Sequence, residues 1–227
     1  MNQISVGGGL LATEGKWIEF DGLHYFCSGV DGDMYQHNID ALKTIEGVEL
    51  KTVVDIGAHV GFTALPCAKR GATVWAFEAN PWTFASLIAG IMRNRLAHMV
   101  KPHQLAVAQG PQRLVDIRSP VLVCGMGGMV QAEDQPVVAS TVTIDFEAVL
   151  NMTGPIDLLK LDTEGSEHEL LPSISKSAWK EVRYMHLETH DVEQVRWHAK
   201  GAKNIDWEKL IRSVGFERMT DAMWRMT

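Results

Sequence analysis

The sequence VVDIGAHVGF at residues 53–62 decides the fold. A short apolar run leads into a glycine-containing loop and then into a helical stretch, an order typical of the unit that binds nucleotides at its strand-to-helix loop. His59 stands where the dinucleotide fingerprint GxGxxG has its second glycine, and Asp55 comes just before the loop. The segment therefore predicts a nucleotide-type ligand, but one that tolerates a carboxylate and does not need that glycine.

The acidic residue at the end of the apolar run selects between two ligand classes. Dinucleotides place their pyrophosphate at the amino end of the helix, where backbone amides and the helix dipole favour negative charge, and Asp55 would repel it. S-adenosylmethionine (SAM) has no phosphate and carries a sulfonium cation and an ammonium group. We therefore expect SAM rather than NAD at this loop.

A second acidic residue supports a nucleoside ligand of either class. Glu78 ends the next apolar run, VWAFEAN, near the offset of about 20 residues at which a carboxylate meets ribose hydroxyls. The residues expected to bind the cofactor are Asp55, Gly57, Ala58, His59, Gly61, Glu78, Ala79 and Asn80.

The order of patterns along the chain predicts an α/β fold. The segment WIEFDGLHYF places Asp21-Gly22 between two alternating runs, as in a β-hairpin, and a helical pattern follows at residues 34–47. From Val53 onward, short apolar runs alternate with helical stretches, which is typical of parallel βαβ units. Asn80-Pro81 is expected to cap and begin the second helix of this series.

The domain organisation is expected to be simple. A chain of 227 residues with 46% hydrophobic content suits one domain, residues 1–227, with a hairpin and helix extension at 1–50 and a Rossmann-like core at 51–227. The rhythm breaks at about 113–142, where a flexible inserted loop containing Met126 and Met129 is a candidate lid over the acceptor.

Charge and composition exclude several kinds of partner. A formal net charge of −7 disfavours nucleic acid as the main partner, because phosphate binding relies on an excess of Lys and Arg. No apolar run reaches the length of about 18 residues that a membrane span needs, and no secretory leader is apparent, so we expect a cytoplasmic protein. Cys27, Cys67 and Cys124 are too few and too scattered for a disulfide framework and are expected to be reduced.

The motifs together resemble a known family. VVDIGAHVGFTA, VWAFEANP, the later Asn94, and IDLLKLDTEGSEHELL followed by HLETH are similar to the FkbM-type family of class I SAM-dependent methyltransferases, from about Val53 to His190. The resemblance implies a doubly wound, mostly parallel seven-stranded sheet with SAM at the carboxyl ends of its first two strands. It also implies methylation of a hydroxyl group on a sugar or secondary metabolite. His59 departs from the asparagine that is common at its position in the family.

The segment KLDTEGSE combines structural and chemical features. Lys160 lies in an apolar run, where an unpaired ammonium is very costly, so it needs Asp162 or Glu164 as a partner. Ser166 and Glu169 have the spacing of a helix capping box. In the functional interpretation, Asp162 or Glu164 faces the methyl donor or orients the acceptor.

A hydroxyl acceptor needs a proton acceptor. His186, Glu188 and His190 share one face if their segment is extended, and His190 is the favoured base, with His186 as an alternative core residue. Asp162, Glu164, Glu188 and His190 could ligate a divalent ion, but no spacing requires one and no metal is predicted. The predicted catalytic residues are Asp162, Glu164 and His190.

The predicted function is transfer of a methyl group from SAM to an oxygen of a small molecule or glycan. Two alternatives stay open at this point: an NAD-linked oxidoreductase on a similar sheet, and a non-catalytic module that keeps the SAM pocket.

Overall fold

The computed structural model describes residues 15–27, 32–118, 137–190 and 204–227. Its centre is a seven-stranded sheet in the order β11-β12-β10-β9-β3-β4-β5. β12 pairs antiparallel with β10 and β11, and the other pairings in this sheet are parallel. The strands of this sheet are β3 (Thr52–Ile56), β4 (Thr73–Phe77), β5 (Val100–His103), β9 (Ile156–Leu161), β10 (Val182–Leu187), β11 (Phe216–Arg218) and β12 (Met223–Met226).

This strand order confirms the predicted fold class. β4 and β5 extend the sheet to one side of β3, whereas β9 and β10 extend it to the other, so the order reverses between β3 and β9. In open α/β sheets, ligands bind at the carboxyl ends of the strands beside such a reversal. The fold therefore places the loop after β3 and the turn after β9 at the expected binding position.

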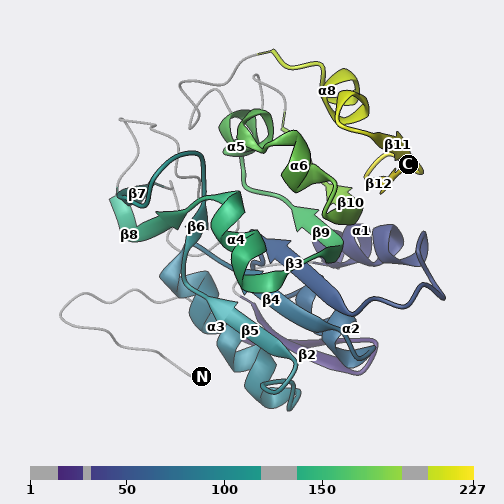
Figure 1. Cartoon of the computed structure of the whole chain (residues 1–227). Coiled ribbons are helices and arrows are strands. Elements are labelled where there is room, and N and C mark those ends of the chain that lie inside the picture. Colours follow the sequence, from purple (N-terminus) through teal and green to yellow (C-terminus); the bar gives the residue numbers. More distant parts are fainter. Residues whose placement is uncertain (1–14, 28–31, 119–136, 191–203) are drawn as a thin grey trace.

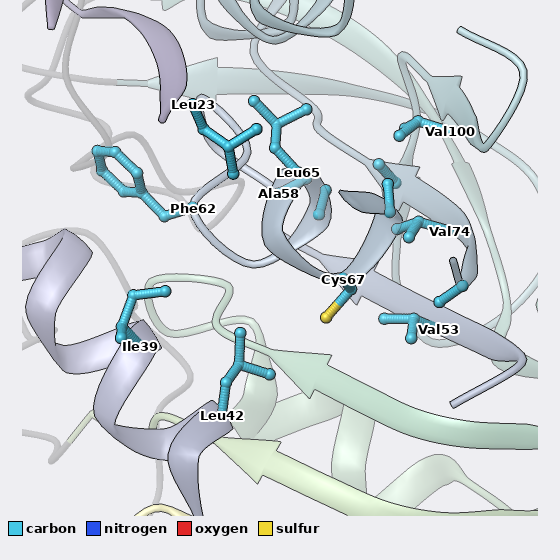
Figure 2. Close-up of a cluster of buried hydrophobic side chains, with 14 of the residues drawn as sticks. Leu23, Ile39, Leu42, Val53, Ala58, Phe62, Leu65, Cys67, Val74 and Val100 are labelled. Carbon is cyan, nitrogen blue, oxygen red and sulfur yellow. The ribbon is translucent and has the colours of Figure 1, made fainter. Parts of the chain in front are cut away.

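Helices cover both faces of the sheet (Figure 1). Side chains alternate between the two faces along each strand, and both faces are apolar. Val53 packs on the side of α1, α2 and α3, whereas its neighbour Val54 packs on the side of α4, α5, α6 and α8. Figure 2 shows part of the first of these clusters, to which Leu42 of α1, Leu65 of α2 and Val53 of β3 belong. The helices are α1 (Gly32–Lys43), α2 (Ala64–Lys69), α3 (Pro81–Arg93), α4 (Phe146–Thr153), α5 (Glu167–Ser173), α6 (Lys176–Trp179) and α8 (Trp207–Ser213).

The N-terminal hairpin packs against the same hydrophobic cluster as α1. β1 (Lys16–Phe20) and β2 (Leu23–Cys27) pair antiparallel across the turn at Asp21 and Gly22, whose φ angles are 51° and 67°. Asn94, at the end of α3, accepts a hydrogen bond from the amide of His24 and donates one to its carbonyl. The predicted hairpin is confirmed, and its backbone is held to the end of α3 by these two hydrogen bonds.

Two further predictions on local structure are confirmed. The side chain of Asn80 accepts a hydrogen bond from the amide of Trp82 at 3.0 Å, and Pro81 is the first residue of α3. Cys27 and Cys67 are buried, the thiol of Cys67 is free, and Cys124 lies outside the described residues. Within the described part of the chain, no helix combines the length and apolar character needed to cross a membrane.

The segment at 113–142, predicted as a flexible inserted loop with strand-like fragments, has regular strands at its ends. Its ends form two strands, β7 (Leu114–Arg118) and β8 (Val137–Ile144), which pair antiparallel. β8 also pairs with β6 (Ala106–Val107), a part of HQLAVA, so a second sheet has the order β6-β8-β7. The expected lid residues Met126 and Met129 lie outside the described residues.

Candidate functional site

A row of polar side chains crosses the centre of the sheet on the face covered by α1. Asp55 of β3 lies opposite Lys160 of β9, and Lys160 lies opposite His186 of β10. Asp55 has no exposed surface, and Lys160 and His186 are only 4% and 1% exposed. Burial lowers the pKa of His186 to about 3, so its imidazole is neutral at physiological pH.

Lys160 is the cation of this row. Its Nζ donates to the carbonyl oxygen of Gly57 at 2.6 Å and lies 3.3 Å from Asp162 Oδ2 and 3.7 Å from Asp55 Oδ1. Burial alone would lower the pKa of Lys160, but Asp162 and Asp55 together raise it. The predicted pairing with Asp162 is confirmed, and the structure adds Asp55 as a second partner that sequence spacing did not suggest.

The loop after β3 uses its own amides within the protein. The amides of Gly57 and Ala58 donate to the carbonyl of Phe77 at 2.9 and 3.0 Å, and the amide of Gly61 donates to Ala58. The amide of His59 donates to Glu78 Oε2 at 2.8 Å. A pyrophosphate-binding loop presents such amides to its ligand, but the amides of Gly57, Ala58, His59 and Gly61 already have acceptors within the protein.

Glu78 connects this loop to the end of β4. Its Oε2 accepts from His59, and its Oε1 accepts from the amide of Asn80 at 2.9 Å. Each carboxylate oxygen keeps a further lone pair for a ligand hydroxyl. Because the carboxyl is 9% exposed, burial raises its pKa to about 7. Ala79 is half-buried beside it, so the predicted cofactor-binding residues do come together at one edge of the sheet.

Gly57 lies against the turn after β9. A Cβ atom at this position would stand 1.7 Å from the carbonyl oxygen of Asp162 and 2.9 Å from its carbonyl carbon. The φ angle of Gly57 is 74°, a region that side chains disfavour. Glycine is therefore required by close backbone contact between two strand ends, and Asp162 is brought beside the loop.

A second cluster of polar side chains, separate from the row of Asp55, Lys160 and His186, surrounds Glu167 of α5. Glu167 is fully buried, and its Oε1 accepts from both the amide and Nδ1 of His190, at 3.0 and 2.7 Å. Its Oε2 accepts from Thr163 Oγ1 and from the amide of Gly165, each at 2.8 Å. His168 Nε2 donates to the carbonyl oxygen of His190 at 2.8 Å. His190 is thus held through its backbone and its ring.

Glu164 faces His190 from a tight turn. Its Oε2 lies 3.6 Å from His190 Nε2, and its φ of 51° is uncommon for a residue other than glycine. Burial and the nearby Asp162 raise the pKa of Glu164 to about 7. Burial would lower the pKa of His190, but Glu167, Glu164 and Asp162 outweigh it and raise this pKa to about 9. At neutral pH, His190 is therefore a cation beside a carboxyl that titrates near 7.

Glu188 lies directly after β10, at the same edge of the sheet. Its Oε2 lies 3.7 Å from Nε2 of His37 on α1. Ligand atoms of Asp162, Glu188 and His190 lie within 4.8 Å of one another, close enough to surround one cation. Exposed acidic groups often come this close without an ion, and the expected absence of a metal stays a prediction.

Sequence reasoning missed Glu167 and misread the start of α5. Ser166 has helical backbone angles and its side chain accepts no capping hydrogen bond, so the predicted capping box of Ser166 and Glu169 is wrong. The acceptor that satisfies the turn is Glu167, through Gly165 and Thr163. An acidic residue in the first helical turn was the available signal, but helix-dipole stabilisation explains such a residue equally well.

The geometry agrees with a family comparison. Residues 55–218 match the model of the methyltransferase FkbM domain, which is more than half of the chain. The chain belongs to this family. A 31-O-demethyl-FK506 methyltransferase from Streptomyces tacrolimicus is 28% identical over 180 residues, which are 65% of this chain and 69% of that protein. The FkbM chain is therefore a methyltransferase, and the predicted family resemblance is confirmed.

One solved structure supports the fold. The FkbM chain superposes on a T. thermophilus 16S rRNA N2 G1207 methyltransferase, in complex with AdoMet and guanosine, with a TM-score of 0.50 at 16% identity. The match covers 98% of this chain and 53% of that one, so the chain spans about half of that enzyme's length. A precorrin-6y C5,15-methyltransferase from Geobacter metallireducens matches with a TM-score of 0.47 at 9% identity, over 79% of this chain and 71% of that one.

Proposed function

We propose that this FkbM chain transfers a methyl group from SAM to a hydroxyl oxygen of a small molecule or glycan. The observation that carries the proposal is the state of the loop after β3. The amides of Gly57, Ala58, His59 and Gly61 have acceptors within the protein, while the carboxylates of Asp55 and Glu78 lie beside them. Such a site offers acceptors and negative charge, which suit the hydroxyls, ammonium and sulfonium of SAM and disfavour phosphate.

Charge at the neighbouring strand ends favours the same ligand. Asp55, Asp162, Glu164, Glu167 and Glu188 supply carboxyl groups around Lys160 and His190, so the carboxyl groups outnumber these two cations. A cationic ligand compensates this excess, and the like charges otherwise favour proton uptake by the carboxyls. Burial is the largest cause of the raised pKa of the half-buried Glu164 and Glu188, and the nearby Asp162 raises both further.

The acceptor class follows from the proton acceptor at the site. When bound, SAM supplies an electrophilic methyl group. An acceptor hydroxyl that takes this methyl group would give its proton to the Glu164 carboxylate, while the C–S electron pair would stay with the sulfur of the departing S-adenosylhomocysteine. A base with a pKa of about 7 is well matched to this transfer near neutral pH. The S. tacrolimicus relative is named for 31-O-demethyl-FK506, which supports an oxygen acceptor.

This assignment changes the role expected for His190. At a pKa of about 9 it is charged at neutral pH and cannot accept a proton. It lies 3.6 Å from Glu164 and favours the ionised form of that carboxyl. We therefore place the base at Glu164, with His190 as the cation beside it and Asp162 held by Lys160.

Ligand-induced stabilisation tests the proposed cofactor. SAM and S-adenosylhomocysteine are expected to raise the melting temperature, and NAD is expected to leave it unchanged. Ribose hydroxyls that donate to Glu78 favour its ionised form, so binding lowers a pKa of about 7 and releases protons. SAM affinity should therefore rise about tenfold between pH 6 and pH 8, as measured by calorimetry in two buffers of different ionisation enthalpy. Stabilisation by NAD without stabilisation by SAM would refute the proposal.

The base is tested by Glu164→Gln. Methyl transfer from labelled SAM to a panel of sugar and macrolide hydroxyls should be about 100-fold slower in this variant, because general-base catalysis contributes at least this factor. In the parent protein, kcat should rise with pH through about 7, since Glu164 accepts a proton only when ionised. Glu164→Gln should lack this rise but keep its affinity for SAM. Glu181→Gln, at an exposed position, is the matched control. An unchanged pH profile in Glu164→Gln would place the base elsewhere.

A further inference from the structure

Among the described carboxylates of the site, Glu167 is the most fully satisfied by hydrogen bonds. It is fully buried, and its two oxygens accept four hydrogen bonds, two from His190 and one each from Thr163 and Gly165. A carboxylate that accepts several hydrogen bonds is held in its ionised form, and the pKa of Glu167 is lowered although burial opposes this. Glu167 is therefore a fixed negative charge behind His190.

The contact with His190 also fixes a ring orientation. One oxygen of Glu167 binds both the backbone amide and Nδ1 of the same histidine, at 3.0 and 2.7 Å. Rotation of the ring would break the shorter of these bonds. With Nδ1 occupied, Nε2 points to Glu164 Oε2, 3.6 Å away. A hydrogen bond to one ring nitrogen sets the state and direction of the other.

We propose that Glu167 is a positioning residue, which keeps His190 charged and aimed at Glu164, so that Glu164 stays an ionised base at neutral pH. This inference rests on the proposed function. Glu167 acts through His190 and touches neither SAM nor acceptor, so it is not itself a catalytic residue.

The charges around this pair come from every neighbouring element. Asp162 and Glu164 face His190 from the turn after β9, and Asp162 is paired with Lys160. Glu188 faces Glu164 from the end of β10, and His59 faces Asp162 from the loop after β3. Among these groups in the described part of the chain, Glu167 is the one that accepts a hydrogen bond from the His190 ring. Its removal is therefore expected to change the charge of His190 more than the loss of any other carboxylate in the group.

The test is Glu167→Gln, compared with Glu169→Gln on the exposed side of the same helix. The pKa of His190 is read from its ring resonances by NMR, without substrate. Glu167→Gln should lower this pKa by about 1 to 2 units, since a contacting opposite charge typically has this effect. Glu169→Gln should leave it unchanged. A His190 pKa in Glu167→Gln within a few tenths of a unit of the parent value would overturn the inference.

A second readout separates positioning from simple structural support. With a pKa lowered by 1 to 2 units, His190 loses part of its charge near neutral pH and favours the ionised form of Glu164 less, so the rise of kcat with pH should move to higher pH in Glu167→Gln, and kcat at pH 7 should fall by about twofold to threefold. Activity should recover toward pH 9. A structural defect would instead lower kcat equally at every pH, and that result would overturn the proposal.

Glu167→Asp covers the case in which the glutamine variant does not fold. It keeps the charge and withdraws it by one methylene, so the shift in the rise of kcat should be smaller and in the same direction. Equal loss at all pH values in this variant would also overturn the inference. If the parent protein transfers no methyl group while Glu167→Gln still lowers the His190 pKa, the proposed function fails, and with it the catalytic purpose of Glu167. If methyl transfer occurs and the His190 pKa does not move, the inference alone fails.

Discussion

Replacing Lys160 with methionine is expected to lower the free energy of unfolding at pH 7 by about 3 to 5 kcal/mol, because removal of one partner leaves buried charge uncompensated. Lys160 Nζ lies 3.7 Å from Asp55 Oδ1 and 3.3 Å from Asp162 Oδ2, and Asp55 is completely buried. The same change removes the donor to the carbonyl of Gly57. Urea unfolding followed by circular dichroism measures the loss.

The pH dependence of this loss identifies its cause. Burial raises the pKa of Asp55 in the folded protein, and without Lys160 it rises further. A carboxyl whose pKa is higher in the folded than in the unfolded protein contributes its full stability below the unfolded pKa of about 4 and loses it as pH rises. The loss of unfolding free energy in Lys160→Met should therefore become smaller as pH falls from 7 to 5. Adding Asp55→Asn to Lys160→Met should restore part of the stability. Lys176→Met, at an exposed position in α6, should stay within about 0.5 kcal/mol of the parent protein. A deficit as small as that control would contradict a paired, buried Lys160.

Much of the fold could be predicted because its signals are local. The positive φ angles at Asp21 and Gly22 follow from a two-residue hairpin turn, and the pair Asn80-Pro81 alone marks a helix start. Alternating apolar runs and helical stretches likewise indicate parallel units without reference to distant residues. The small sheet of β6, β7 and β8 could not be predicted in this way, because its pairings join segments about 30 residues apart, around residues 119–136.

The candidate site divides along the same line. Asp55, Glu78 and Asp162 were found because each follows an apolar run, and parallel strands end at one edge of the sheet. The pairing of Lys160 with Asp55 depends on the register between β3 and β9, which alternation within one strand cannot supply. Glu167 was missed for a related reason, since its partner His190 lies 23 residues further along the chain. The charge state of His190 could not be predicted from sequence either, because it depends on nearby carboxylates that make His190 a cation at neutral pH.

Replacing Gly57 with alanine should abolish SAM binding and destabilise the fold. The new Cβ would lie 1.7 Å from the carbonyl oxygen of Asp162, which is backbone and cannot rotate away. Relief of the clash requires the loop after β3 and the turn after β9 to move apart, and the bond from Lys160 to the Gly57 carbonyl spans the same gap. We expect a loss of at least about 3 kcal/mol in unfolding free energy, as for other severe backbone conflicts. Thermal shift with SAM should show no stabilisation.

Gly47→Ala separates the clash from ordinary backbone strain. Gly47 has a φ of 80°, close to the 74° of Gly57, but a Cβ added there would meet nothing within 4 Å. This control should cost about 1 to 2 kcal/mol, the penalty of a left-handed residue with a side chain, and should keep its response to SAM. The difference in unfolding free energy between the two variants then measures the steric clash of a methyl group between the two strand ends. If Gly57→Ala loses no more stability than Gly47→Ala and still responds to SAM, the loop and the Asp162 turn do not form one binding edge.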